Sequence, residues 1–325
     1  DAIKFQTFQP ENMVSRFAPK ADYQLKVTDS GQSQLQMLKV LRFDETQHKE
    51  LFAHCQACNI AFMSSPFDLE SLDLLINGLN VSGIKIASGE ITNAPLLFKA
   101  ASSGKKIILS TGMSTLGDIE AGLGVLALAY LGTGEPPSVE ACRQAYTSAE
   151  GQNLLREKVI LLHCTTEYPA PINEVNLYAL DTLRTAFGLN VGFSDHTRGI
   201  AVSIAAAARG AVVIEKHFTL DKKLPGPDHQ ASLEPDEFMA MVKSIREVEA
   251  ALGSLIKMPS PSEVKNRDTV RKSVVAASSI KQGEVFTKQN LAIKRPGTGI
   301  SPFNYWAMLG KKAVRDFATD ELVEL

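Results

Sequence analysis

Two histidines follow predicted neighbouring strands, His196 after the apolar run 191–193 and His217 after the run 211–215. Because alternate residues of a strand share a face, His196 points to the same side as Ser194, and His217 to the same side as Glu215. Two imidazoles that leave further positions to water and substrate are typical of an open catalytic site for a divalent metal. The alternative is that each histidine only completes the polar rim of a sheet.

Two lysines interrupt otherwise apolar strands, Lys4 near the start of the chain and Lys85 in the third run. A lysine in such a place is costly unless an opposite charge is supplied to it. Together with the strand-end hydroxyls of Ser88, Ser110 and Ser194, the two lysines predict an anion site, best suited to phosphate. A single buried lysine could equally form a Schiff base, as in barrel aldolases, but two on separate strands favour anion binding.

Three further polar residues lie on loops that follow strands. Glu90 comes shortly after Lys85 and is either a general acid/base or a structural ion-pair partner of that lysine. Tyr168 and Asp228 lie on loops stiffened by proline. Such loops suit the binding of a hydroxyl-rich substrate, although loops of this composition are often only turns.

The elements that must position these residues alternate between strands and helices. Seven short apolar runs predict strands: 2–5, 60–63, 83–87, 106–109, 159–163, 191–193 and 211–215. Helix-periodic segments lie between and after them: 68–79, 94–103, 115–130, 177–187, 199–209 and 235–252. Near-continuous apolar strands that alternate with helices predict an α/β fold with a parallel sheet.

We expect these strands to form a (β/α)₈ TIM barrel, because the polar residues cluster at the strand ends where barrel enzymes keep their chemistry. Seven strands are visible, so the first strand and helix of such a barrel would precede residue 1. An open doubly wound sheet is the competing fold, but no G-x-G-x-x-G motif follows an early strand. The predicted domains are a barrel over 1–252, a Pro- and Ser-containing linker over 253–267, and a small β-rich module over 268–325.

Composition excludes several classes of protein. The 325 residues carry 34 Lys and Arg against 36 Asp and Glu, a net charge of −2, so neither a nucleic acid nor an anionic membrane surface is an expected partner. No uncharged stretch reaches the ~18 apolar residues of a membrane span. Four cysteines are too few for a disulfide framework in a chain of this length, which predicts a cytoplasmic location.

The motifs taken together resemble the sialic acid synthase family over the whole chain, and the final module is similar to that family's antifreeze-like (SAF) domain. Nine segments carry the resemblance: Lys4-Phe-Gln-Thr7, Ser64-Ser-Pro-Phe67, Lys85-Ile-Ala-Ser-Gly-Glu90, Leu109-Ser-Thr-Gly-Met113, His163-Cys-Thr-Thr-Glu-Tyr-Pro169, Gly192-Phe-Ser-Asp-His196, Glu215-Lys-His-Phe-Thr219, Pro225-Gly-Pro-Asp228 and Lys294-Arg-Pro-Gly297.

The resemblance implies a transferase that condenses phosphoenolpyruvate with N-acetylmannosamine to give N-acetylneuraminate and phosphate. It places a divalent metal, Mn²⁺ or Mg²⁺, on His196 and His217, where the metal would act as a Lewis acid. It assigns phosphoenolpyruvate to Lys4, Lys85, Ser88, Ser110 and Ser194. The residues that it assigns to the sugar are Gln6, Ser65, Phe67, Glu90, Tyr168 and Asp228, with Thr166 standing where some members carry Asn. Glu90 is also an acid/base candidate.

The resemblance further implies a domain-swapped homodimer in which Arg295 enters the active site of the partner subunit. One rival substrate is a 2,4-diacetamido-6-deoxy hexose, which the same chemistry would convert into a legionaminate. A lysine-dependent aldolase is a rival of a different class. A non-enzymatic scaffold would leave the paired histidines and lysines unexplained.

Overall fold

The computed structural model describes residues 1–21, 24, 25, 31 and 33–325. The chain forms two compact units, Asp1–Gly253 and Ser254–Leu325. The boundary between them lies within one residue of the predicted start of the linker. No helix in the described part of the chain is both long and apolar enough to cross a membrane.

All seven predicted strands are present in the described part of the first unit, and every ladder between them is parallel. They are β1 (Ala2–Thr7), β2 (Ala61–Pro66), β3 (Gly83–Ile86), β4 (Lys106–Ser110), β5 (Val159–Cys164), β6 (Asn190–Asp195) and β7 (Ile214–Lys216). Strands β1 and β2 form one sheet, and β3 to β7 form a second sheet in chain order. The prediction of an α/β fold with a parallel sheet is therefore confirmed.

A closed eight-stranded barrel is not confirmed, because the seven strands hydrogen-bond in two separate groups within the described residues. The strands nevertheless curl toward closure. The side chain of Lys4 on β1 forms an ion pair with Glu215 on β7, so the inner faces of the first and last strands meet. On β6, Gly192 permits a close approach of backbone, since a Cβ there would lie 2.5 Å from the Val213 carbonyl oxygen.

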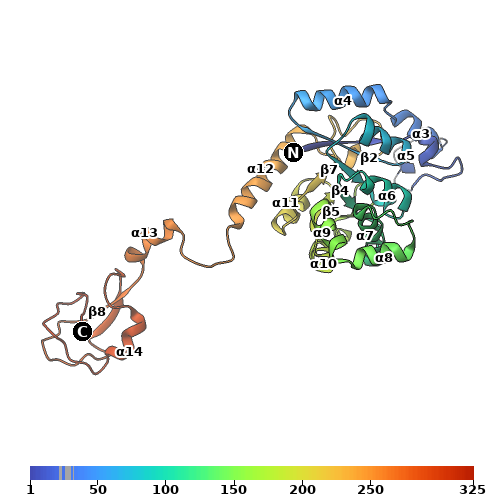
Figure 1. Cartoon of the computed structure of the whole chain (residues 1–325). Coiled ribbons are helices and arrows are strands. Elements are labelled where there is room, and N and C mark those ends of the chain that lie inside the picture. The colour runs from blue at the N-terminus through green and yellow to red at the C-terminus, as the bar shows by residue number, and fades with distance from the viewer. Residues whose placement is uncertain (22–23, 26–30, 32) are drawn as a thin grey trace. The chain divides into compact units, whose positions relative to one another are not determined.

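Helices surround the strands (Figure 1). Those of the first unit are α1 (Pro10–Met13), α3 (Gln34–Leu41), α4 (Glu45–Ala57), α5 (Leu69–Asp73, continued as a π-helix over Leu74–Gly78), α6 (Ala94–Ser102), α7 (Leu116–Leu131), α8 (Val139–Thr147), α9 (Ala149–Lys158), α10 (Ala179–Phe187), α11 (Ala201–Ala208) and α12 (Pro235–Leu252). Thr115 and Asp118 form a capping box that starts α7. The strands and helices bury one large apolar core between them, which holds the strand ends in place.

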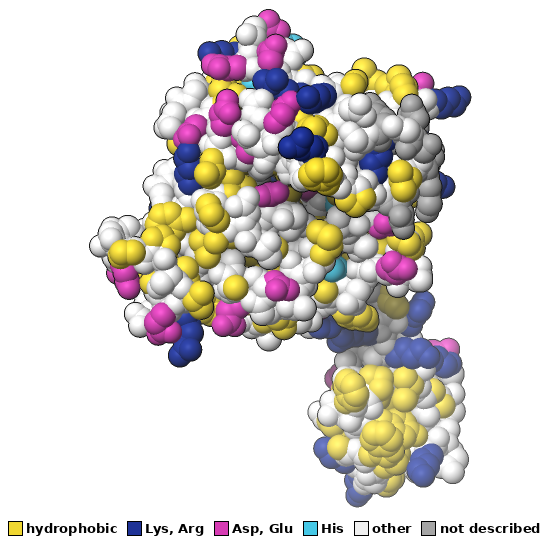
Figure 2. Space-filling view, turned by 90° about the vertical axis from the view of Figure 1, so that its right-hand side faces the viewer, with side chains coloured by type: hydrophobic (Ala, Val, Ile, Leu, Met, Phe, Trp, Pro, Cys, Tyr) yellow, Lys and Arg dark blue, Asp and Glu magenta, His cyan; other side chains and the backbone are white. Residues whose placement is uncertain are grey.

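The second unit is a small β-rich module, as predicted. Strand β8 (Ser273–Ala276) pairs antiparallel with β9 (Leu291–Lys294), and α14 (Tyr305–Met308) packs on a core of its own. Figure 2 shows apolar side chains gathered on one face of this unit with Lys and Arg beside them. Phe303 is 93% exposed and Trp306 is 75% exposed.

The second half of the predicted linker 253–267 is helical. Helix α13 (Pro261–Val270) occupies that part of the segment. Ser260 caps the helix, its capping box is completed by Glu263, and Pro261 takes the first helical position, where its missing N–H costs nothing. The Ser and Pro residues that suggested a linker are therefore the start signal of a helix.

Candidate active site

The carboxylate of Glu215 joins the two predicted anion-binding lysines. Its Oε1 atom lies 3.0 Å from the Lys4 ammonium and 3.6 Å from the Lys85 ammonium, and it accepts a 2.7 Å hydrogen bond from the Ser194 hydroxyl. Lys85 also donates to Ser110 Oγ at 2.7 Å. Three residues predicted from different strands thus contact one carboxylate that the predicted site did not include, and Ser110 joins them through Lys85.

Burial and the neighbouring charges set the pKa values of Lys85 and Glu215. The Lys85 side chain is 3% exposed, and burial lowers its pKa to about 8 although Glu215 opposes the shift. Burial alone would raise the pKa of Glu215, but Lys4 and Lys85 outweigh it and hold that pKa well below its usual range. Two lysines against one ionised carboxylate leave the pocket with an excess positive charge when Lys85 is protonated. Such a pocket suits an anion.

The two histidines lie side by side at the ends of β6 and β7. Their ring centroids are 5.4 Å apart, and the Tyr168 ring lies 4.2 Å from that of His196 and 5.5 Å from that of His217. Burial lowers the pKa of His196 to about 4 and that of His217 to about 3. Both imidazoles are therefore neutral at pH 7, which is the form that binds a metal.

The arrangement fits a divalent metal on chemical grounds. The Thr165 carbonyl oxygen, which can only accept, lies 2.6 Å from Nδ1 of His196, so that nitrogen carries the proton. The Nε2 lone pair of His196 then faces the pocket, 3.3 Å from Ser194 Oγ. Within the described residues, no cluster of three or more His, Cys, Asp or Glu is placed to hold a metal. A metal here would take its remaining ligands from water and substrate.

Ser88 and Thr166 belong to a neighbouring cluster. The Ser88 hydroxyl accepts a 3.0 Å hydrogen bond from the Gly112 amide and lies 3.1 Å from the Cys164 sulfur. The hydroxyl oxygen of Thr166 is buried without a hydrogen-bond partner. A Cβ at Gly112 would come within 2.3 Å of that oxygen, so only glycine leaves this space open.

Glu90 is not the ion-pair partner of Lys85. The carboxylate that neutralises Lys85 belongs to Glu215, because Lys85 points along the strand ends toward Ser110 and β7. Glu90 lies on the 3₁₀ turn Ser88–Glu90 and accepts a 2.7 Å hydrogen bond from Asn93. Partial burial raises the pKa of Glu90. The ion-pair role that the sequence left open for Glu90 is therefore wrong, and its role as a general acid/base stays a prediction.

The predicted sugar-binding residues lie on several elements. Gln6 on β1 is exposed and is directly opposite the buried Ser65 on β2. Phe67 packs edge to face against Phe8. Asp228 has a raised pKa because of burial, and its Oδ1 atom is buried without a hydrogen-bond partner.

Arg295 belongs to the second unit, where its side chain is exposed. Nothing in the described residues tests whether it contributes to the pocket of another subunit. Its predicted role in a partner subunit therefore stays a prediction.

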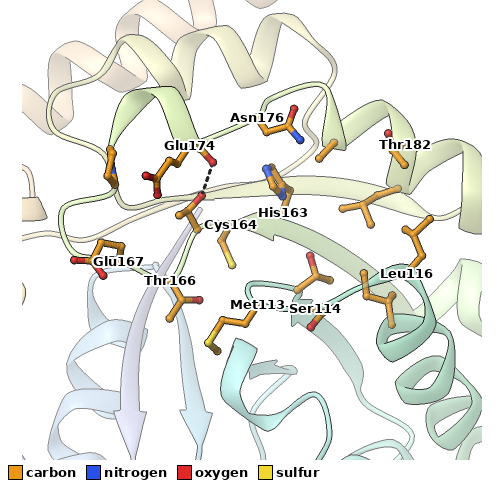
Figure 3. Close-up of a pocket in the computed structure, with 16 residues that line it drawn as sticks. Met113, Ser114, Leu116, His163, Cys164, Thr166, Glu167, Glu174, Asn176 and Thr182 are labelled. Atoms are coloured by element: carbon orange, nitrogen blue, oxygen red, sulfur yellow. Dashed lines mark hydrogen bonds between the residues drawn. The ribbon is translucent and has the colours of Figure 1, made fainter. Parts of the chain in front are cut away.

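A cavity of about 800 Å³ lies beside this site, between the loops that follow β4 and β5 (Figure 3). Met113 and Ser114 line one side, and His163, Cys164 and Thr166 line another. Neither lysine and neither of the paired histidines lines it. The cavity is therefore lined by a different set of residues from those around Glu215.

The sequence carried a signal for Glu215 that the site prediction did not use. Glu215 shares its face of β7 with His217, so the alternation that brings the histidines together also aims a carboxylate into the pocket. Lys85 required an opposite charge, and Glu90 was considered because it is near in the sequence. The true partner comes from a distant strand that only the curvature of the sheet brings close.

Comparison with known proteins gives two family matches. The NeuB family matches residues 1–257, and the SAF domain matches residues 271–324. A Campylobacter jejuni N,N'-diacetyllegionaminic acid synthase is 52% identical over 323 residues, which are 99% of this chain and 90% of the relative. A Legionella pneumophila protein of the same name is 41% identical over 96% of this chain and 82% of the relative.

Among solved structures, the N-acetylneuraminic acid synthetase of Leptospira borgpetersenii in complex with citrate is similar to this chain. The two share 30% identity with a TM-score of 0.64, covering 82% of this chain and 79% of that one.

Replacement of Glu215 by Gln should destabilise the protein, because Lys4 and Lys85 would face each other without their counter-charge. We expect a loss of about 3 kcal/mol in the free energy of unfolding at neutral pH, measured by urea denaturation, since removal of one partner leaves buried charge uncompensated. The double variant Glu215→Gln/Lys85→Met should regain part of the lost free energy of unfolding. Glu237→Gln, which removes a half-exposed pair with Lys222, should cost less than about 1 kcal/mol. Equal stability of Glu215→Gln and the wild type would contradict the assignment.

Proposed function

The chain belongs to the NeuB family and is a transferase of the sialic acid synthase type, and from this premise we propose that it condenses phosphoenolpyruvate with a 2,4-diacetamido-6-deoxy hexose and releases phosphate. The single observation that carries the proposal is the positively charged pocket of Lys4 and Lys85 beside two neutral histidines. The resemblance seen in the sequence favoured N-acetylmannosamine as the sugar substrate. The two N,N'-diacetyllegionaminic acid synthases named above favour the diacetamido sugar instead.

In the proposed reaction, the lysines bind the charged groups of phosphoenolpyruvate. Lys85 donates to Ser110, so this ammonium and the Ser110 hydroxyl, which keeps its own proton, are fixed before the anion arrives, while the Ser194 hydroxyl donates its proton to Glu215. The C3 carbon of phosphoenolpyruvate bonds to the aldehyde carbon of the open-chain sugar. Water adds to C2, and the C2–O bond breaks to release phosphate. The lysines thus bind substrate by charge and form no covalent bond with it.

His196 and His217 are the residues that would hold a divalent metal, Mn²⁺ or Mg²⁺. When bound, such a metal supplies Lewis acidity toward the aldehyde oxygen. The hydrogen bond from His196 Nδ1 to Thr165 and the contact with the Tyr168 ring orient the imidazole whose Nε2 would bind it. Because both imidazoles are neutral, no proton has to leave before metal binds.

The remaining polar groups are assigned to the sugar and to proton transfer. Glu90 is assigned to proton transfer, and the upward shift of its pKa by burial favours that role. The unpartnered oxygens of Thr166 and Asp228 are buried atoms to which a hydroxyl or acetamido group could donate. Gln6, Ser65 and Phe67 complete the proposed sugar-binding set.

We also propose that the second unit completes the active site of a partner subunit in a homodimer. The region 254–325 carries twelve Lys and Arg against seven Asp and Glu, whereas the whole chain has a net charge of −2, so the remainder is acidic. Opposite charges on the two units favour contact between copies. Arg295 offers an exposed guanidinium for the hydroxyl or acetamido groups of a sugar.

The acceptor is tested by phosphate release from phosphoenolpyruvate with a panel of hexoses. We expect the highest kcat/KM with a 2,4-diacetamido-6-deoxy hexose and at least 10-fold less with N-acetylmannosamine, because a pocket that hydrogen-bonds a second acetamido group rejects a sugar that lacks it. A higher kcat/KM with N-acetylmannosamine would contradict the proposed substrate and identify the protein as an N-acetylneuraminate synthase. Trapping of a pyruvate adduct on a lysine by borohydride would contradict the whole proposal and favour an aldolase.

The shared site is tested by mixing two inactive proteins. Arg295→Ala and His217→Ala, each carrying a different affinity tag, are expressed together, and the heterodimer is isolated with both tags. If sites are shared, one site of each heterodimer combines intact His217 with intact Arg295, and we expect up to about half of the wild-type activity. An inactive heterodimer would show that Arg295 acts within its own chain, and an active Arg295→Ala homodimer would show that Arg295 has no role.

A further inference from the structure

A second ion pair, fully buried, lies behind the two histidines. Asp195 Oδ2 is 3.2 Å from Lys216 Nζ, and both side chains are 0% exposed. The two residues are direct partners in the β6–β7 ladder. Asp195 immediately precedes His196, and Lys216 immediately precedes His217, so the pair projects to the opposite face of the sheet from the imidazoles.

The polar atoms of this pair also form hydrogen bonds to Thr197 and to α11. Oδ1 of Asp195 accepts 2.8 Å hydrogen bonds from both the amide and the hydroxyl of Thr197. Oδ2 accepts a 2.6 Å hydrogen bond from Ser203 on α11. The Lys216 ammonium also donates to the Thr197 carbonyl. His196 therefore lies between two residues, Asp195 and Thr197, that are locked to each other and to β7.

We infer that Asp195 and Lys216 are positioning residues that hold His196 and His217 at the separation a shared metal requires. The inference rests on the proposed function, because that function assigns the metal to these histidines. A buried ion pair gives little net stability compared with apolar residues of the same volume. Stabilisation of the fold alone therefore does not explain why Asp195 and Lys216 are placed here. The hydrogen bonds of the pair connect the two peptide segments that carry the imidazoles. Neither side chain faces the pocket, so both act through the backbone.

The test measures Mn²⁺ affinity by calorimetry on the full-length protein after the metal has been stripped. Asp195→Asn should weaken Mn²⁺ binding about 10-fold or more, in the range found when the support of a metal ligand is lost. Thr197→Val and Ser203→Ala, which each remove one hydrogen bond to Asp195 and keep the charge pair, should weaken it by a few fold. These milder variants carry the test if Asp195→Asn does not fold.

Leu126→Ala is the matched control. Leu126 is fully buried on α7, away from the histidines, so its truncation lowers stability without touching the site. We expect its Mn²⁺ affinity to equal that of the wild type. The inference is overturned if Thr197→Val and Ser203→Ala bind Mn²⁺ as the wild type does, or if Leu126→Ala weakens binding equally. A wild-type protein that binds no Mn²⁺ would overturn the metal assignment of the proposed function, and the positioning role with it.

Discussion

The ion cluster of Glu215 with Lys4 and Lys85 is the interaction on which the rest of the candidate site depends. The buried ammonium of Lys85 and the partly buried one of Lys4 require an opposite charge, and Glu215 supplies it from β7. The same contact brings β1 to β7, so one carboxylate both offsets part of the positive charge in the pocket and links the first and last strands of the unit. The excess positive charge that remains is the basis for binding an anionic substrate.

Because strand residues alternate between two faces, β6 and β7 present one set of side chains to the pocket and another set to the helices behind it. Their inner faces present Ser194, His196, Glu215 and His217 to the pocket, while Asp195 and Lys216 join the same strands from behind. The ion pair on the outer face is balanced, whereas the inner face keeps the excess positive charge of two lysines against one carboxylate. The two histidines remain neutral because burial, rather than a neighbouring cation alone, sets their pKa values.

Strand and helix positions could be predicted from the sequence because apolar runs and helical periodicity are local signals. The pairing of His196 with His217 followed from alternation alone, which is also local. The partner of Lys85 could not be found in this way, since Glu215 is brought to it by the curvature of the sheet. Closure of the barrel likewise depends on contacts between distant strands. Helix α13 is different, because its capping box was present in the sequence and its prolines were interpreted as a linker.

The central claim is that a partly protonated Lys85, held by Glu215, binds the anionic substrate. Calorimetry of phosphoenolpyruvate binding at pH 8, in two buffers with different ionisation enthalpies, tests it directly. A Lys85 with a pKa of about 8 is roughly half protonated in the free protein, and a bound anion raises that pKa. The account predicts that binding takes up about half a proton in the wild type and none in Lys85→Arg. Tight binding without proton uptake by the wild type, or the same uptake by Lys85→Arg, would contradict it.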